Sequence, residues 1–192
     1  MMTARTWVSI ATSLDGFIAG EDDDLSWLPG PDSSGDDGGF GPFLGQIGAL
    51  LMGRRTRDVA SGFEGPWPYG TLPVLVATHH PLPPGHASSR DVADPIASLV
   101  RQGLAAAGGK DLCLDGGGII RQALDGGLFD ELVVTFVPCI LGRGIPLFAG
   151  VASRSSLTCS GHRLLSGGML QGTYVPIGGE ATGGSGPAHP KG

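Results

Sequence analysis

Residues 112–120 form the segment whose residue types point most directly to chemistry. They read LCLDGGGII, a short apolar strand that ends on Asp115, followed by three glycines and the start of a helix. Glycine has no Cβ, so the backbone N–H groups of this turn can approach a ligand closely. The N-terminus of the helix that follows favours an anion such as a phosphate. The segment therefore predicts a nucleotide site, with Asp115 beside the part of the nucleotide that reacts.

Two further strand exits carry side chains suited to a nucleotide. The first exit consists of Gly53, Arg54, Arg55 and Thr56. Its two guanidinium groups match the geometry of phosphate oxygens. The second exit consists of Thr78, His79 and His80. Its hydroxyl and imidazoles could contact a ribose phosphate or an adenine. A solvated helix start and an ordinary polar loop remain the alternatives for these two exits.

The three exits follow strands that alternate with helices. We expect strands at residues 7–11, 49–52, 74–77, 112–114 and 132–137, and helices at 54–60, 96–104 and 119–124. Another helix is predicted by one apolar face, formed by Phe40, Phe43, Leu44 and Ile47. Residues 157–175 are typical of a hairpin that turns near Ser166. This order predicts a mostly parallel sheet with helices on both faces and antiparallel strands at one edge. Such sheets bind ligands at the carboxyl ends of their strands.

The composition fits one globular domain and excludes several functional classes. The chain has 192 residues, of which 41% are hydrophobic and 16% are charged, and its formal net charge is −6. A nucleic-acid partner would need a basic face, so none is expected. We expect no membrane partner and a cytoplasmic location, because no apolar run spans a bilayer and no signal peptide is apparent. No metal site is expected. Residues 1–175 are predicted to form the domain, and the Gly/Pro-rich tail 176–192 to be disordered.

Five segments match a known family in the same order along the chain. They are SLDGFIA at 13–19, MGRRT at 52–56, DGGG at 115–118, FDEL at 129–132 and PCILGRGIPLF at 138–148. On these segments the chain resembles the dihydrofolate reductase-like superfamily, in particular stand-alone relatives of the RibD C-terminal reductase domain. The resemblance implies a three-layer α/β fold with a central mixed, mostly parallel sheet of about eight strands, flanking helices and a C-terminal antiparallel hairpin. It also implies a homodimer and NADPH as the cofactor.

The resemblance further implies which residues hold the NADPH. Residues 53–56 would contact the pyrophosphate and the 2′-phosphate, and the pair after Asp115 would be the family's strained, often cis, glycine pair. A mobile loop from residue 17 to about 24 would close over the nicotinamide. The full set of expected cofactor contacts is Ala11, Ile18, Gly53, Arg54, Arg55, Thr56, Thr78, His79, Gly116, Gly117, Gly118 and Ile119.

The activity implied is an NADPH-dependent reduction. A hydride would pass from the nicotinamide to a C=N or C=O carbon of a small pyrimidine- or pterin-like substrate. Asp115 and Asp36 are the candidates to orient the substrate or relay a proton, and either would need a pKa raised by burial. Asp115 could instead only cap the glycine turn, and Asp36 could only be a charge at a helix N-terminus. Asp15 is expected to shape its turn. A non-catalytic nucleotide-binding relative of the same fold is the alternative for the whole protein.

Overall fold

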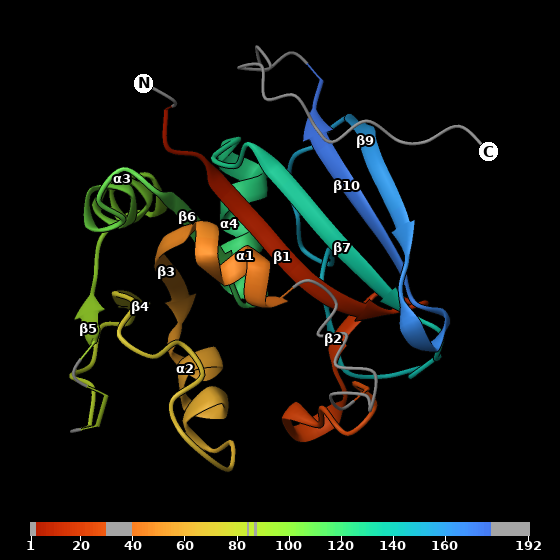
Figure 1. Ribbon diagram of the computed structural model, residues 1–192, viewed down its shortest axis with the longest axis horizontal. Helices are drawn as coiled ribbons and strands as arrows, with labels where there is room; N and C mark the ends of the chain where they lie inside the picture. Colours follow the sequence, from red (N-terminus) through yellow and green to blue (C-terminus); the bar gives the residue numbers. More distant parts are fainter. Residues whose placement is uncertain (1–2, 30–39, 84, 87, 178–192) are drawn as a thin grey trace.

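The computed structural model describes residues 3–29, 40–83, 85–86 and 88–177. Its centre is an eight-stranded sheet in the order β5-β4-β3-β6-β1-β7-β10-β9 (Figure 1). The strands are β1 (Thr6–Ser13), β3 (Ile47–Gly53), β4 (Val74–Ala77), β5 (Ser89–Val92), β6 (Asp111–Asp115), β7 (Glu131–Val137), β9 (Leu157–Leu164) and β10 (Leu170–Pro176). Only the β7–β10 and β10–β9 pairs are antiparallel. The predicted mixed, mostly parallel sheet with a closing hairpin is confirmed.

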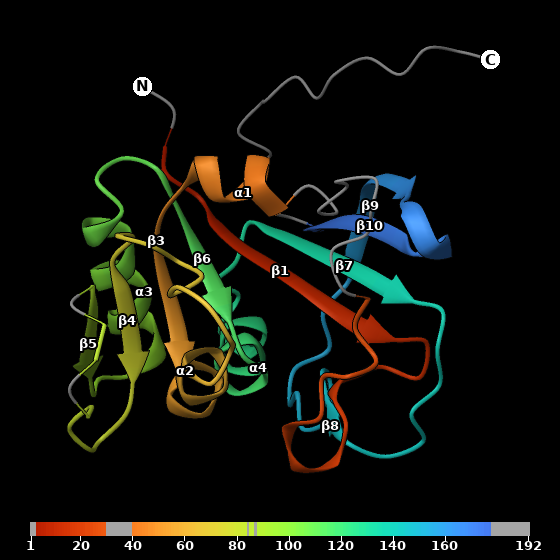
Figure 2. The same cartoon turned by 60° about the horizontal axis from the view of Figure 1, so that its bottom comes forward.

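Helices cover both faces of this sheet. They are α1 (Phe40–Gln46), α2 (Arg54–Ser61), α3 (Ile96–Ala106) and α4 (Gly117–Gly126). Figure 2 shows α1 on one side of the sheet, with α3 and α4 on the other. Side-chain packing follows this division. Leu99 of α3 and Ile120 of α4 belong to one core cluster, together with the strand residues Val8 and Leu114. Phe43 of α1 packs against a second cluster. Within the described residues, no helix has both the length and the apolarity needed to cross a membrane.

Two local elements differ from the sequence prediction. Ile47, expected on a helical face, is the first residue of β3 and is fully buried. The strand begins there because Ile47 pairs with Asp111 on β6. Gly48 lets the strand approach the C-terminal end of α3, since a Cβ at Gly48 would collide with the Ala107 carbonyl. Strand β5 was not predicted, because its central residues Arg90 and Asp91 are exposed and break any apolar pattern. Of the predicted tail 176–192, Pro176 belongs to strand β10, and residues 178–192 lie outside the described part of the chain.

Four short elements extend the carboxyl edge of the sheet. Strand β2 (Phe17–Ala19) pairs with β8 (Ile145–Pro146) as a separate two-stranded sheet. The 3₁₀ turn η1 (Glu21–Asp23) follows β2, and the turn η2 (Ser166–Gly168) joins β9 to β10, as predicted for the hairpin. The expected loop from residue 17 to about 24 therefore lies close to the carboxyl ends of the central strands.

The central strands β1 and β6 leave the sheet toward opposite faces. The chain after β6 enters α4, whereas the chain after β1 continues through β2 toward α1. Strand β6 pairs with β1 only as far as Val8 and ends one residue later than Leu114, but β1 stays paired with β7 up to Ser13. Ligands of open α/β sheets bind where neighbouring strands diverge in this way. The fold therefore places the candidate site at the carboxyl ends of β6 and β1.

Candidate functional site

The N-termini of α2 and α4 meet at the carboxyl ends of β3 and β6. Helix α2 begins after Gly53 and α4 begins after Gly116, and neither N-terminus has a side-chain cap. A Cβ at Gly116 would collide with the Thr56 hydroxyl and would lie 3.7 Å from the Gly53 nitrogen. First-turn N–H groups have no acceptor within their own helix, and helix N-termini carry partial positive charge. Two such ends side by side form a site for an anion.

Glycine is required at the start of α4 by both conformation and space. Gly116 has φ 85° and ψ 135°, a region that side chains disfavour. A Cβ at Gly117 would lie 2.9 Å from the Ile18 Cδ1 atom and from an Arg121 nitrogen. The described residues contain no cis peptide bond, so the expected cis glycine pair is wrong here. The turn is made instead by the positive φ of Gly116.

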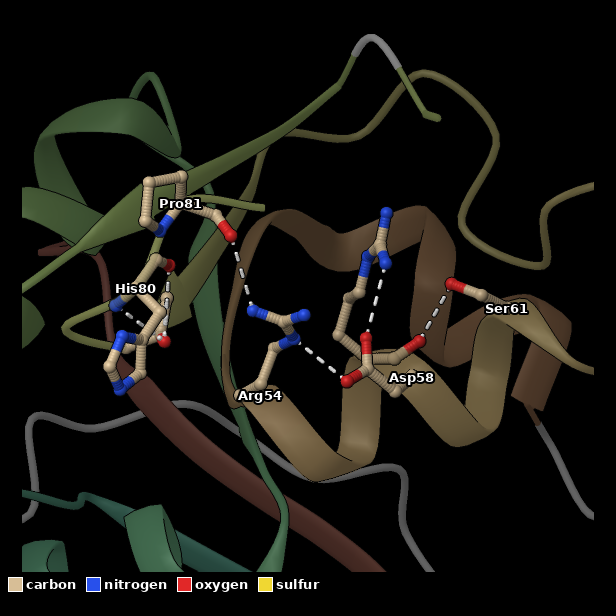
Figure 3. A network of polar contacts seen from close by, with 7 residues as sticks. Arg54, Asp58, Ser61, His80 and Pro81 are labelled. Atoms are coloured by element: carbon tan, nitrogen blue, oxygen red, sulfur yellow. Dashed lines mark hydrogen bonds and ion pairs between the residues drawn. The ribbon is translucent and has the colours of Figure 1, made fainter. Parts of the chain in front are cut away.

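Both arginines of the first strand exit have carboxylate partners. The Nε of Arg54 donates to the Asp58 Oδ2 at 2.7 Å, and its Nη1 donates to the Pro81 carbonyl at 3.4 Å (Figure 3). The Arg55 Nε lies 2.6 Å from the Asp23 Oδ1 on turn η1. Exposed ion pairs of this kind are weak, and a doubly charged phosphate group competes well for their guanidiniums. Both guanidinium groups of this exit are therefore held at the surface by weak ion pairs.

The exit after β4 is joined to the exit after β3. Thr78 closes its own turn, because its hydroxyl accepts a hydrogen bond from the His80 nitrogen at 3.2 Å and donates to the His80 carbonyl at 3.3 Å. The next residue, Pro81, accepts the hydrogen bond from Arg54 (Figure 3). His79 is exposed beside this turn. The structure thus brings together the two exits that the sequence predicted separately.

Asp115 lies at the end of β6 on the face of the sheet that carries α1. Its Oδ2 accepts a hydrogen bond from the Tyr69 hydroxyl at 3.2 Å, and its Oδ1 accepts one from the Gly116 nitrogen at 2.7 Å. Burial raises the pKa of Asp115, and these two hydrogen bonds offset only part of that effect. The raised pKa is the property that a proton donor near neutral pH needs.

Tyr69 is a site residue that the sequence reasoning missed. It belongs to the loop between α2 and β4, where no periodic pattern marks it. Burial, followed by the charge of Asp115, raises the pKa of Tyr69, so its hydroxyl stays a hydrogen-bond donor. Its ring packs edge-on against Trp67 with centroids 5.1 Å apart, and Trp67 stacks on His86 at 3.9 Å. These aromatic contacts fix the loop over Asp115.

Asp15 fixes the turn that leads from β1 to β2. Its carboxylate accepts hydrogen bonds from the Ser13 hydroxyl at 2.6 Å, the Leu141 nitrogen at 3.1 Å and the Gly142 nitrogen at 2.7 Å. The hydrogen bond from Ser13 lowers the pKa of Asp15, and the two backbone donors add to the effect against partial desolvation. Asp15 thus shapes its turn, as expected, and it ties this turn to the segment before β8.

The other predicted residues divide into three groups. Ile18 on β2 is in range of a Cβ at Gly117, at the start of α4, whereas Ala11 lies on β1 beyond the last residue that pairs with β6. Gly118 is exposed in the first turn of α4, whereas the side chain of Ile119 is buried in the core, so only its backbone can face a ligand. Asp36 lies outside the described residues. Of the two catalytic candidates, only Asp115 therefore lies within the described residues.

Comparison with known proteins assigns the chain to a family. The family model of the RibD C-terminal domain matches residues 6–171. Two proteins of Bacillus subtilis strain 168, both called uncharacterized, are similar to this chain. YyaP is 31% identical over 183 residues, which are 88% of this chain and 94% of YyaP. YwjB is 27% identical over 182 residues, which are 91% of this chain and 99% of YwjB.

Solved structures share the fold. A protein from Shewanella sp. PV-4 that is named for riboflavin biosynthesis superposes with a TM-score of 0.80 at 33% identity, over 90% of this chain and 99% of that one. A pyrimidine reductase-like protein from Corynebacterium diphtheriae superposes with a TM-score of 0.65 at 15% identity, over 91% and 92% of the two chains, which supports the fold alone. With the match over residues 6–171, this chain belongs to the RibD C-terminal domain family.

Proposed function

We propose that this protein is an NADPH-dependent reductase that transfers a hydride to a C=N or C=O carbon of a small pyrimidine- or pterin-like heterocycle. The observation that carries the proposal is the meeting of two uncapped helix N-termini next to Asp115, whose pKa is raised. The relative from Shewanella sp. PV-4, which is 33% identical and is named for riboflavin biosynthesis, supports a small heterocyclic substrate.

The residues at the helix N-termini fit the phosphates of NADPH. A Cβ at Gly116 would fill the space between the two helix starts, so the cradle exists only because this residue is glycine. The pyrophosphate would take the first-turn N–H groups of α4, from Gly117 to Ile119, and the hydroxyl of Thr56. Arg54 and Arg55 would bind the 2′-phosphate side after release from their carboxylate partners.

The remaining contacts follow from the positions of the other exits. Thr78 and His79 would lie on the adenosine side, because Arg54 links their turn to α2. Ala11 and Ile18 would border the nicotinamide, since both lie where β6 has ended and α4 begins. Their small and apolar side chains would keep water away from the ring.

Asp115 would supply the proton that balances the hydride. NADPH would supply the hydride, and the substrate nitrogen or oxygen next to the reduced carbon would then need a proton. A carboxyl group whose pKa is raised by burial holds a proton that it can transfer to that atom. Tyr69 would act as a positioning residue, because its hydrogen bond fixes the orientation of the Asp115 carboxyl group.

Calorimetric titration with NADPH and NADH tests the proposal. NADPH should bind more tightly than NADH, and Arg54→Ala with Arg55→Ala should weaken NADPH binding about ten- to a hundredfold, since hydrogen bonds to charged groups are among the strong ones. Arg154→Ala, an exposed arginine remote in sequence from the exits, is the matched control. Binding of neither nucleotide would refute the proposal. NADPH binding without oxidation by any pyrimidine or pterin would favour the non-catalytic alternative.

We also propose that the protein is a cytoplasmic homodimer. All three cysteines, Cys113, Cys139 and Cys159, are free thiols, which suits a reducing compartment. Large apolar side chains are exposed near one end of the sheet, with Ile140 75% and Leu164 78% accessible. Exposed apolar side chains at this density favour contact with a second copy of the chain. Sedimentation of the purified protein should give twice the monomer mass of 19.5 kDa.

A further inference from the structure

A row of hydrogen-bonded side chains crosses β7, β10 and β9 beside Ala11. In the sheet register Ala11 pairs with Thr135, Thr135 pairs with Gln171, and Gln171 pairs with Arg163. The Gln171 Nε2 lies 2.9 Å from the Thr135 Oγ1, and the Arg163 Nε lies 2.7 Å from the Gln171 Oε1. None of these three polar residues entered the sequence prediction.

This row lies on the same face of the sheet as Asp115. Side chains alternate between the two faces along a strand. Val134 packs in the core cluster beneath α3 and α4, so its neighbour Thr135 points to the other face. The ring of Trp7 packs against Phe43 of α1 with centroids 5.8 Å apart, and Ala11, four residues further along β1, points the same way. Thr135 and Ala11 therefore both face the side of α1.

The chemistry of the row gives its hydrogen bonds one direction. A guanidinium group can only donate, so the Gln171 amide must turn its oxygen toward Arg163. Its nitrogen then faces Thr135 and donates to the Thr135 oxygen. Because that oxygen accepts from Gln171, the Thr135 proton must point away from Gln171. The methyl side chain of Ala11 leaves room on the opposite side, so the Thr135 hydroxyl can donate a hydrogen bond over Ala11.

We infer that Thr135 is a substrate-binding hydrogen-bond donor, oriented by Gln171 and Arg163, and that it selects heterocycles with a carbonyl oxygen over those with an amino group at the same ring position. The inference rests on the proposed function, in which Ala11 borders the nicotinamide and the substrate ring lies against the nicotinamide to receive its hydride. Asp115 and Thr135 stand on strands that flank β1. Asp115 is level with Val133, two residues before Thr135. With strands about 4.8 Å apart and a rise of about 3.3 Å per residue, roughly 12 Å separates the two backbones, which a small heterocycle hydrogen-bonded to both side chains can bridge.

Gln171→Glu tests the inference, because it reverses the direction of the hydrogen bond between residue 171 and Thr135 while the row of side chains is kept. A glutamate accepts from Arg163 and also from Thr135, so the Thr135 proton turns toward residue 171 and an oxygen lone pair faces the ligand. The probes are 5,6-diaminouracil and 4,5,6-triaminopyrimidin-2-one, which carry oxygen and an amino group, respectively, at ring position 4. Each probe is titrated by calorimetry into the protein saturated with NADPH.

The wild-type protein should bind the oxo probe about tenfold more tightly than the amino probe, and Gln171→Glu should invert that preference. Thr135→Ser should keep the wild-type ratio, whereas Thr135→Val should abolish it. Gln102→Glu makes the same change of charge on α3, across the sheet, and should leave the ratio unchanged. An unaltered ratio in Gln171→Glu would overturn the inference, as would binding of neither probe by the wild-type protein.

Two further measurements separate this inference from the proposed function. NADPH titration in the absence of a probe tests the proposed function alone. Neutron diffraction from the deuterated wild-type protein tests the direction of the row without any ligand. The Thr135 deuteron should point away from Gln171 and toward the space above Ala11, and a deuteron directed at Gln171 would overturn the inference.

Discussion

The central strands have paired charged side chains at their amino ends and helix N-termini without side-chain caps at their carboxyl ends. At the amino ends, Arg5 lies 3.6 Å from Asp111 and 3.4 Å from Glu131, and Asp130 accepts a hydrogen bond from the Thr6 nitrogen at 2.7 Å. At the carboxyl ends, the two helix N-termini have no side-chain caps, and the partners recorded for Asp115 within the described residues are neutral donors. The charged side chains that are paired at the amino ends stabilise the sheet. The helix N–H groups that have no side-chain cap at the carboxyl ends can bind a ligand.

The largest effect should come from the glycine that joins the two helix starts. Gly116→Ala should lower the free energy of unfolding by about 3 kcal/mol, because it places a side chain at φ 85° and against the Thr56 hydroxyl. It should also abolish NADPH binding. Gly118→Ala is the control, since a Cβ there meets nothing within 4 Å and alanine favours a helix. Urea denaturation measures both variants, and equal stabilities would contradict the packing described here.

A smaller effect is expected at the amino ends. Arg5→Met should lower the free energy of unfolding by about 2 kcal/mol, because it leaves two partly buried carboxylates without their cation. NADPH affinity should not change, because Arg5 lies at the end of the strands opposite the helix starts. Arg90→Met on the exposed strand β5 serves as the control. A loss of NADPH affinity in Arg5→Met would contradict the conclusion that the amino ends of the strands serve stability and not ligand binding.

The smallest effect should be a gain in stability at the carboxyl ends. Burial raises the pKa of Asp115 above the usual 3.8, so its ionisation opposes folding at neutral pH. That cost is absent well below pH 3.8, where the folded and unfolded forms are both protonated, and it grows as the pH rises from 3.8 to the raised pKa and is constant above it. Asp115→Asn should therefore stabilise the protein near pH 7.

The pH dependence of this gain is the informative measurement. Urea denaturation of Asp115→Asn and wild-type protein should show a difference near pH 7 that disappears near pH 3. Asp91→Asn, on the exposed edge strand, controls for the change of charge. A gain that persists at pH 3 would mean that packing, and not ionisation, separates the two proteins.

Most of the parallel half of the fold was predictable from sequence. Strands β4 and β6 are short apolar runs between turn residues, and both appear within a residue or two of the predicted bounds. The start of β3 was not predictable from local pattern, because Ile47 is held there by pairing with Asp111 on β6. Local periodicity identifies a buried run, but long-range pairing decides whether its first residue belongs to a helix or a strand.

The site was only partly predictable for a similar reason. The glycine exits are local motifs, and the structure brings them together at one edge of the sheet. Tyr69 reaches Asp115 across 46 residues, and Gln171 reaches Thr135 across 36 residues. Neither side chain belongs to a motif of its own. Such residues become visible only when the register of the sheet is known.

The strand order has a consequence for the way the chain folds as it is synthesised. Strand β1 is the first strand made, yet it pairs only with β6 and β7, whose contacting residues lie more than 100 positions later, as in Thr6 with Leu112 and Trp7 with Glu131. Closing such long loops is slow because much chain entropy is lost before the contacts form. A nascent chain that stops before β6 leaves Val8 and Ile10 without a partner strand. The strand that forms the floor of the ligand site is therefore made well before the strands that secure it.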